Sequence, residues 1–131
     1  MGDRVFLDAN VLFSAAYREG AGLARLWGLD GVQLITSGYA AEEARRNLAV
    51  GGQQDRLEKL LRAVEIVVEA DPAHCAEEDR LPEKDRPILR AAVQAGATHL
   101  LTGDATHFGR FFGDRLDGVL VLPPGTFLRS R

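Results

Sequence analysis

The stretch that decides the fold is residues 84–108, which read KDRPILRAAVQAGATHLLTGDATHF. Asp85 occupies a position typical of a helix N-cap, and Pro87 falls in the first turn, where a missing backbone N–H costs little. Apolar residues then repeat on one helical face, namely Ile88, Leu89, Ala92 and Val93. Gly96 is expected to end this helix, because glycine readily follows a helix C-terminus.

A short strand is predicted directly after that helix, over residues 99–102. Asp104 follows it, so a carboxylate lies just beyond the carboxyl end of the strand. The same arrangement occurs at the start of the chain, where residues 4–8 have an apolar middle and end in Asp8. Open α/β sheets bind their ligands at the carboxyl ends of their strands, so both acids are expected at a ligand site.

The rest of the chain alternates between strand and helix patterns. Asn10 is expected to cap a first helix, and Ser37 to cap a helix over residues 38–48. Other strands are predicted at residues 32–36, 65–69 and 119–122, and other helices at 23–27, 57–64 and 106–112. Residues 71–83 are acidic and contain prolines, which predicts a surface loop with one helical turn. This order predicts an α/β three-layer sandwich, with a mostly parallel central sheet and helices on both faces.

Composition favours one globular domain over residues 1–131 in the cytoplasm. The chain is 46% hydrophobic and 27% charged, with a net charge of −3, which argues against a surface coated in positive charge for nonspecific nucleic-acid binding. One cysteine, Cys75, excludes an internal disulfide and a cysteine-based zinc site. Neither a signal peptide nor a run of transmembrane length is expected, so no membrane association is predicted.

Four carboxylates are the candidate functional residues. Asp8 and Asp104 follow strands, whereas Glu43 and Asp85 are expected in the first turns of helices that begin near the same sheet edge. Helical geometry favours Glu43 over its neighbour Glu42 as the inward-facing acid. Several carboxylates brought together repel one another unless a cation intervenes, and oxygen ligands of this kind suit Mg²⁺ or Mn²⁺. Such a site is typical of phosphodiester hydrolysis, in which metal ions activate water and polarise phosphate.

Each of these residues also has a purely structural interpretation. Asp85 is as well explained by a helix cap as by metal binding, and Glu43 alone is most simply a solvated glutamate. Asp8 and Asp104 are less easily explained, although acids also form turns. Asn10 and Thr102 are the candidate supporting residues. Asn10 is favoured as a helix cap over a contact to a metal-bound water, although the two roles are compatible, and Thr102 either caps a helix or orients a carboxylate. A surface or packing role is favoured for His107 over contact with a phosphate or water.

Other enzyme and binding classes that begin with a strand and an acid fit less well. A phosphatase of the haloacid-dehalogenase type needs a second aspartate two residues after the first, and Asn10 occupies that position. A receiver domain needs an acidic pair and a late lysine that are not placed here. The chain also lacks the glycine pattern of dinucleotide-binding folds and the Walker A lysine.

The motifs that carry the four acids resemble those of the PIN domain family, which includes VapC-type toxins. They are VFLDANVL with Asp8, ITS followed by Glu43, LPEKDRPILRAA with Asp85, and LLTGD with Asp104. The resemblance implies that Asp8, Glu43, Asp85 and Asp104 form an acidic Mg²⁺ or Mn²⁺ pocket that cleaves RNA. It also implies an antitoxin partner and a homodimer.

The chain departs from the family pattern in two places. Ala9 stands where many members have a hydroxyl residue, and no further acid follows Asp104 in its turn. The alternative function is that of a PIN-fold nucleic-acid-binding or scaffold protein with little or no catalysis, because an intact pocket does not prove turnover.

Overall fold

The structure is a computed structural model that describes residues 2–68 and 75–131. Its centre is a six-stranded sheet with the order β3-β2-β1-β4-β6-β5. The strands are β1 (Asp3–Leu7), β2 (Val32–Ser37), β3 (Glu65–Val67), β4 (His99–Leu101), β5 (Arg115–Leu116) and β6 (Val119–Leu122). Neighbouring strands are parallel except β5, which pairs antiparallel with β6. The predicted mostly parallel sheet is therefore confirmed.

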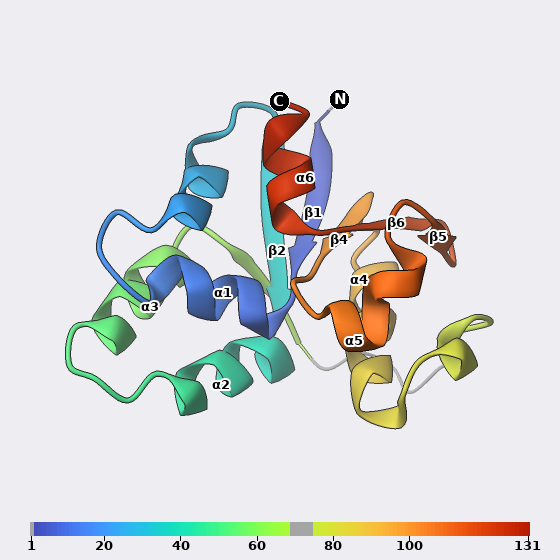
Figure 1. The fold of residues 1–131 in the computed structure, drawn as a ribbon, viewed down its shortest axis with the longest axis horizontal. Coiled ribbons are helices and arrows are strands. Elements are labelled where there is room, and N and C mark those ends of the chain that lie inside the picture. Colours follow the sequence, from blue (N-terminus) through green and yellow to red (C-terminus); the bar gives the residue numbers. More distant parts are fainter. Residues whose placement is uncertain (1, 69–74) are drawn as a thin grey trace.

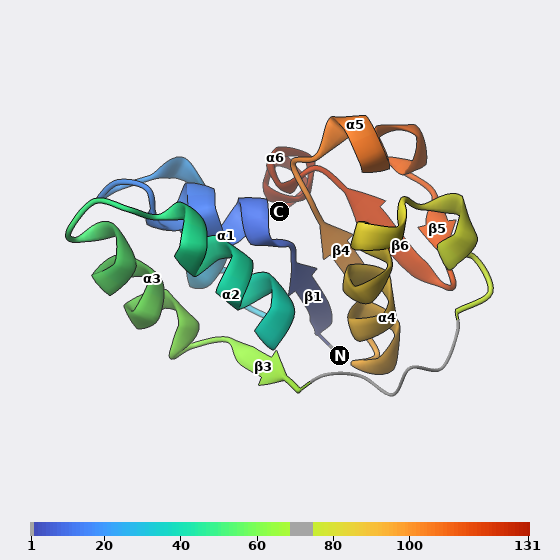
Figure 2. The same ribbon diagram turned by 90° about the horizontal axis from the view of Figure 1, so that it is seen from below.

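Helices cover the sheet on both sides. The α-helices are α1 (Ala9–Ala16), α2 (Gly38–Asn47), α3 (Gln53–Leu61), α4 (Arg86–Gln94), α5 (Ala105–Phe108) and α6 (Pro124–Arg129). The 3₁₀ helices are η1 (Gly22–Gly28), η2 (Glu78–Arg80), η3 (Glu83–Asp85) and η4 (Gly109–Phe111). Figure 1 shows α1, α2 and α3 gathered on one side of the sheet and α4 and α5 on the other, and Figure 2 shows the same separation from below.

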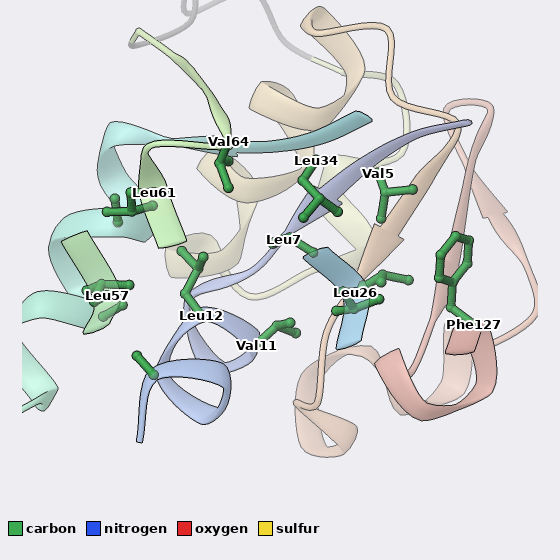
Figure 3. Close-up of a cluster of buried hydrophobic side chains, with 14 of the residues drawn as sticks. Val5, Leu7, Val11, Leu12, Leu26, Leu34, Leu57, Leu61, Val64 and Phe127 are labelled. Carbon is green, nitrogen blue, oxygen red and sulfur yellow. The ribbon is translucent and has the colours of Figure 1, made fainter. Parts of the chain in front are cut away.

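Two hydrophobic clusters hold the helices against the sheet. Side chains alternate along β1, so Val5 and Leu7 enter the cluster shown in Figure 3, whereas Phe6 enters the second cluster with α4 and α5. The first cluster includes Leu12 of α1 and Phe127 of α6, which are both fully buried. This double burial explains why the central strands read as nearly continuous apolar runs.

The strand order creates a switch point between β1 and β4. The chain leaves β1 towards β2 and β3, returns to β4 beside β1, and then continues outward to β6. The segments that follow β1 and β4 therefore diverge, and open α/β sheets typically bind ligands at such a point. Asp8 and Asp104 follow these strands.

The structure corrects two of the predicted helix caps. The cap of α1 is Asp8, whose side chain accepts a hydrogen bond from Ala9 N, and Asn10 lies inside the helix. Asp85 precedes α4, but its side chain makes no capping hydrogen bond because its backbone is helical (φ −95°, ψ −9°), whereas capping residues are usually extended. Ser37 caps α2 as predicted, through Ala40 N.

Several element boundaries also differ from the prediction. Residues 22–28 form a 3₁₀ helix, and β3 ends at Val67, while residues 69–74 of the predicted strand and loop lie outside the described residues. The segment before α4 has two 3₁₀ turns, η2 and η3. Strand β5 and helix α6 were not predicted. No helix in the described parts of the chain is long and apolar enough to cross a membrane.

Candidate metal centre

The Asp8 corner, which comprises Asp8, Asn10 and Thr102, lies at the carboxyl end of β1. Asp8 Oδ1 accepts a hydrogen bond from Ala9 N at 2.7 Å, and its Oδ2 accepts from Thr102 Oγ1 at 2.9 Å and from Asn10 Nδ2 at 3.2 Å. Asp8 is only 6% exposed. Three donors thus fix the orientation of a nearly buried carboxylate.

Asn10 and Thr102 connect the ends of β1 and β4. Asn10 Nδ2 donates to Thr102 Oγ1 at 3.2 Å, and Asn10 Oδ1 accepts from Gly103 N at 2.7 Å. Thr102 Oγ1 also accepts from Asp104 N at 3.1 Å. A Cβ on residue 103 would lie 3.3 Å from Asn10 Oδ1, so glycine allows this close approach. Both residues therefore position acids, whereas the sequence left this role open.

Burial and neighbouring charges both raise the pKa of Asp8. Burial raises the pKa of Asp8 to about 6, and the charges of Glu43 and Asp85 act in the same direction. Hydrogen bonds from Thr102 and Ala9 N oppose this rise. A cation near Asp8 would stabilise the ionised form.

The Asp85 corner comprises Asp85, Asp104 and His107, and it is connected to the Asp8 corner by the bond from Asp104 N to Thr102 Oγ1. His107 Nδ1 lies 2.9 Å from Asp85 Oδ2 and 3.0 Å from Asp104 Oδ2. One ligand atom from each of the three residues falls within 4.8 Å of the other two. Asp104 Oδ1 accepts from His107 N at 3.1 Å, which fixes the start of α5. Helix α5 thus carries His107 back over the acids.

Two of the atoms that could bind a metal in the Asp85 corner lack a hydrogen-bond partner among the described residues. Asp85 Oδ2 and His107 Nδ1 are buried, and neither has such a partner within residues 2–68 and 75–131, so their short separation lacks the direction of a hydrogen bond. Burial raises the pKa of Asp85, and Asp104 and Glu43 raise it further, while His107 and Lys84 oppose the shift. Buried polar atoms without partners are costly, and a cation would satisfy both.

Glu43 lies at the edge of this arrangement. It belongs to the second turn of α2, which begins at Gly38, so the predicted first-turn position is wrong. Its side chain is partly buried, whereas Glu42 is exposed and pairs with Arg45 at 3.5 Å. Glu43 lines a cavity of about 350 Å³ with Ala9, Asn10, Phe13 and Asn47. Its charge reaches Asp8 and Asp85, but Glu43 is outside the compact Asp85 corner.

His107 is the residue whose place in the centre the sequence did not favour. Its position three residues after Asp104 could have indicated this place. A residue that caps a helix lies next to the residue three positions after it, so a capping Asp104 brings His107 close. The chain thus offers carboxylate oxygens and one imidazole nitrogen at the switch point. This donor set fits a divalent cation such as Mg²⁺ or Mn²⁺.

Fold and site together define an α/β domain with an acidic centre at the carboxyl edge of a mainly parallel sheet. The model of the PIN domain family matches residues 4–106 of this chain. The chain belongs to the PIN domain family.

Solved structures support the same fold. VapBC2 from Rickettsia felis, solved with a DNA fragment from its promoter, is 16% identical with a TM-score of 0.67, covering 92% of this chain and 98% of that chain. The sarcin-ricin loop cleaving toxin VapC20 from Mycobacterium tuberculosis is 13% identical with a TM-score of 0.56, covering 86% of this chain and 98% of that chain. Comparison with curated proteins gives no match.

Proposed function

We propose that this chain is a Mg²⁺- or Mn²⁺-dependent endoribonuclease and the toxin of a toxin–antitoxin pair. The observation that carries the proposal is the cluster of Asp85, Asp104 and His107, whose ligand atoms lie within 4.8 Å of one another, with the charges of Asp85 and Glu43 acting on Asp8. Membership of a nuclease-type family supports the reaction class. RNA hydrolysis, the metal and the partner are the proposed parts.

Asp8, Glu43, Asp85 and Asp104 are the acids that would hold the metal. When bound, a divalent cation polarises a phosphate and lowers the pKa of water for attack on phosphorus. Thr102 and Asn10 keep Asp8 oriented through hydrogen bonds of 2.9 and 3.2 Å. The capping bond from His107 N keeps Asp104 in place. These contacts hold the carboxylates in fixed orientations, as metal-dependent hydrolysis requires.

Basic and aromatic side chains beside the acids are suited to RNA. Lys84 acts electrostatically on Asp85, and Arg46 acts on Tyr39, whose hydroxyl donates to Lys84 O at 3.1 Å. Cations at the rim can contact the phosphates of a strand whose scissile bond lies over the acids. Phe13 lines the cavity beside Glu43 and offers a surface for stacking by a base.

Cleavage of RNA tests the proposed activity. Mg²⁺ or Mn²⁺ should support cleavage of single-stranded or structured RNA, and EDTA should abolish it. Undiminished cleavage in EDTA would rule out the mechanism. Tight RNA binding without cleavage under any of these conditions would favour the alternative, a binding or scaffold role for this PIN fold.

The partner and assembly need separate tests. One structural neighbour is a VapBC complex, and for this chain we propose an antitoxin encoded by the adjacent reading frame, with action in the cytoplasm. Co-expression should yield a stable complex with lower RNase activity than the free chain. We also propose a homodimer, and a strictly monomeric mass by light scattering would contradict it.

A further inference from the structure

The Asp85 corner contains a nitrogen donor that an all-carboxylate site would not have. His107 Nδ1 lies 2.9 Å from Asp85 Oδ2 and 3.0 Å from Asp104 Oδ2. In an octahedral site with bonds of about 2.1 Å, adjacent ligand atoms lie about 3 Å apart. The distances from His107 Nδ1 to the two carboxylate oxygens therefore match the spacing of adjacent ligands on one cation, and all three atoms lie within 4.8 Å of one another.

Hydrogen bonding does not account for this arrangement. His107 Nδ1 and Asp85 Oδ2 are both buried and lack hydrogen-bond partners in the part of the chain that the structure describes, and Asp85 is 9% exposed. In the neutral tautomer with its proton on Nε2, the Nδ1 lone pair would face two carboxylates. That contact is repulsive, and a cation that binds all three atoms would remove the repulsion.

The backbone keeps the imidazole in this position. His107 N donates to Asp104 Oδ1 at 3.1 Å, so the residue that supplies one donor oxygen also fixes the backbone that carries the nitrogen. The His107 side chain is 25% exposed, so the ring does not project freely into solvent. Asp8, in contrast, already accepts hydrogen bonds from Ala9, Asn10 and Thr102. The free donor atoms are therefore concentrated in the Asp85 corner.

We propose that His107 Nδ1 binds the divalent cation together with Asp85 and Asp104, and that this nitrogen makes the site prefer Mn²⁺ to Mg²⁺. The inference rests on the metal-dependent function proposed above. Mg²⁺ favours oxygen ligands and keeps much of its water, whereas imidazole binds transition metals more readily. An imidazole ligand thus favours the transition metal.

Pulsed electron paramagnetic resonance of bound Mn²⁺ tests the contact directly. The metal-free chain should bind Mn²⁺ with a nitrogen coupling that changes when histidine is labelled with ¹⁵N. His107→Gln should lose this coupling, and its affinity for Mn²⁺ should fall by about tenfold or more, which is the usual effect of removing a residue that supports a metal site. Its Mg²⁺ affinity should change much less, so the ratio of the two affinities falls.

His99→Gln is the matched control, because His99 lies in β4 with its ring against Phe127 at 5.0 Å. It should keep the coupling and the Mn²⁺ affinity. Thermal unfolding without metal checks that both variants fold, and a variant that does not fold is replaced by the asparagine variant at the same position. Mn²⁺ binding without nitrogen coupling would overturn this inference alone, whereas failure of the wild type to bind either cation would overturn the proposed function as well.

Discussion

The two corners of the acidic centre show opposite ways of holding a carboxylate. In the Asp8 corner, three donors surround one buried acid and connect the ends of β1 and β4. In the Asp85 corner, two acids and an imidazole face one another, and two of their buried atoms lack a hydrogen-bond partner. The hydrogen bonds of the Asp8 corner are made without a ligand, whereas the Asp85 corner leaves oxygen and nitrogen atoms that could bind a cation. The comparison predicts that metal binding depends most on the Asp85 corner and that metal-free stability depends most on the Asp8 corner.

The largest expected effect is on catalysis. Asp104→Asn keeps the acceptor that caps α5 but removes a ligand charge, so RNA cleavage should fall by at least about 100-fold, as expected when several kcal/mol of metal stabilisation are lost. Rates with saturating Mn²⁺ provide the measurement. Glu42→Gln is the control, because Glu42 is exposed beside Glu43, and its rate should match the wild type. An active Asp104→Asn variant would remove Asp104 from the catalytic set.

The second effect is on metal-linked stability. A cation at 100 times its Kd adds about 2.7 kcal/mol to the folded state, which corresponds to about 10 °C in Tm for a chain of this size. Asp104→Asn should show less than about half of the Mn²⁺-induced shift of the wild type, and Asp8→Asn should lose a smaller part of it, because Asp8 already accepts three hydrogen bonds. Differential scanning calorimetry with Mn²⁺ and with EDTA gives the shifts. Equal shifts in all three proteins would refute both acids as ligands.

The third effect is on stability as a function of pH without metal. The pKa of Asp8 rises from 3.8 to about 6 on folding, so between these two pH values the folded state binds more protons than the unfolded state. The free energy of unfolding therefore falls as pH rises through this range. Two pKa units correspond to about 3 kcal/mol. Asparagine keeps one oxygen and so loses either the bond from Ala9 N or the two bonds to Oδ2, at about 1 kcal/mol each, so Asp8→Asn should be about 1–2 kcal/mol more stable than the wild type at pH 7.5.

Urea unfolding in EDTA at pH 4 and pH 7.5 measures this difference. The advantage of Asp8→Asn should disappear at pH 4, where the wild-type carboxyl is protonated in the folded state. A variant that is less stable than the wild type at pH 7.5 would instead indicate that Asp8 acts mainly as the cap of α1.

The smallest effect concerns the hydroxyl that connects the two strand ends. Thr102→Val removes one donor to Asp8 and one acceptor for Asp104 N, and metal-free stability should fall by about 1 kcal/mol. Thr106→Val, at an exposed position of α5, should leave stability unchanged within about 0.5 kcal/mol. A Thr102→Val variant as stable as the wild type would show that the Thr102 hydroxyl adds nothing to the other bonds between the two strand ends.

The main features of the fold followed from local patterns in the sequence. Apolar runs flanked by acids or glycines located the central strands, and the capping role of Ser37 and the end of α4 near Gly96 agree with the structure. Helix α6 was not predicted, because two consecutive prolines, Pro123 and Pro124, more often mark a turn or loop. Pro124 instead begins the helix, where its fixed φ and missing N–H are tolerated, and Phe127 anchors it in the core.

The site was less predictable from the sequence because it depends on how the helices and strands are oriented relative to one another. Asp8 and Asn10 are both good capping residues, and the choice between them depends on where β1 ends. Asp85 could not be recognised as a non-capping residue before the turn that precedes α4 was known. The contact between His107 and Asp85 joins two segments whose approach is determined by packing of α4 and α5 on the sheet.

The switch point also has a mechanical consequence. Asp8 and Glu43 belong to the part of the chain that builds β1, β2 and β3, whereas Asp85, Asp104 and His107 belong to the part that builds β4, β5 and β6. A cation bound by acids from both parts would act as a cross-link between the two halves of the sheet, next to the bond from Asp8 N to Leu101 O. Loading the site would then slow amide hydrogen exchange along the β1–β4 pair, several residues away from the ligands themselves.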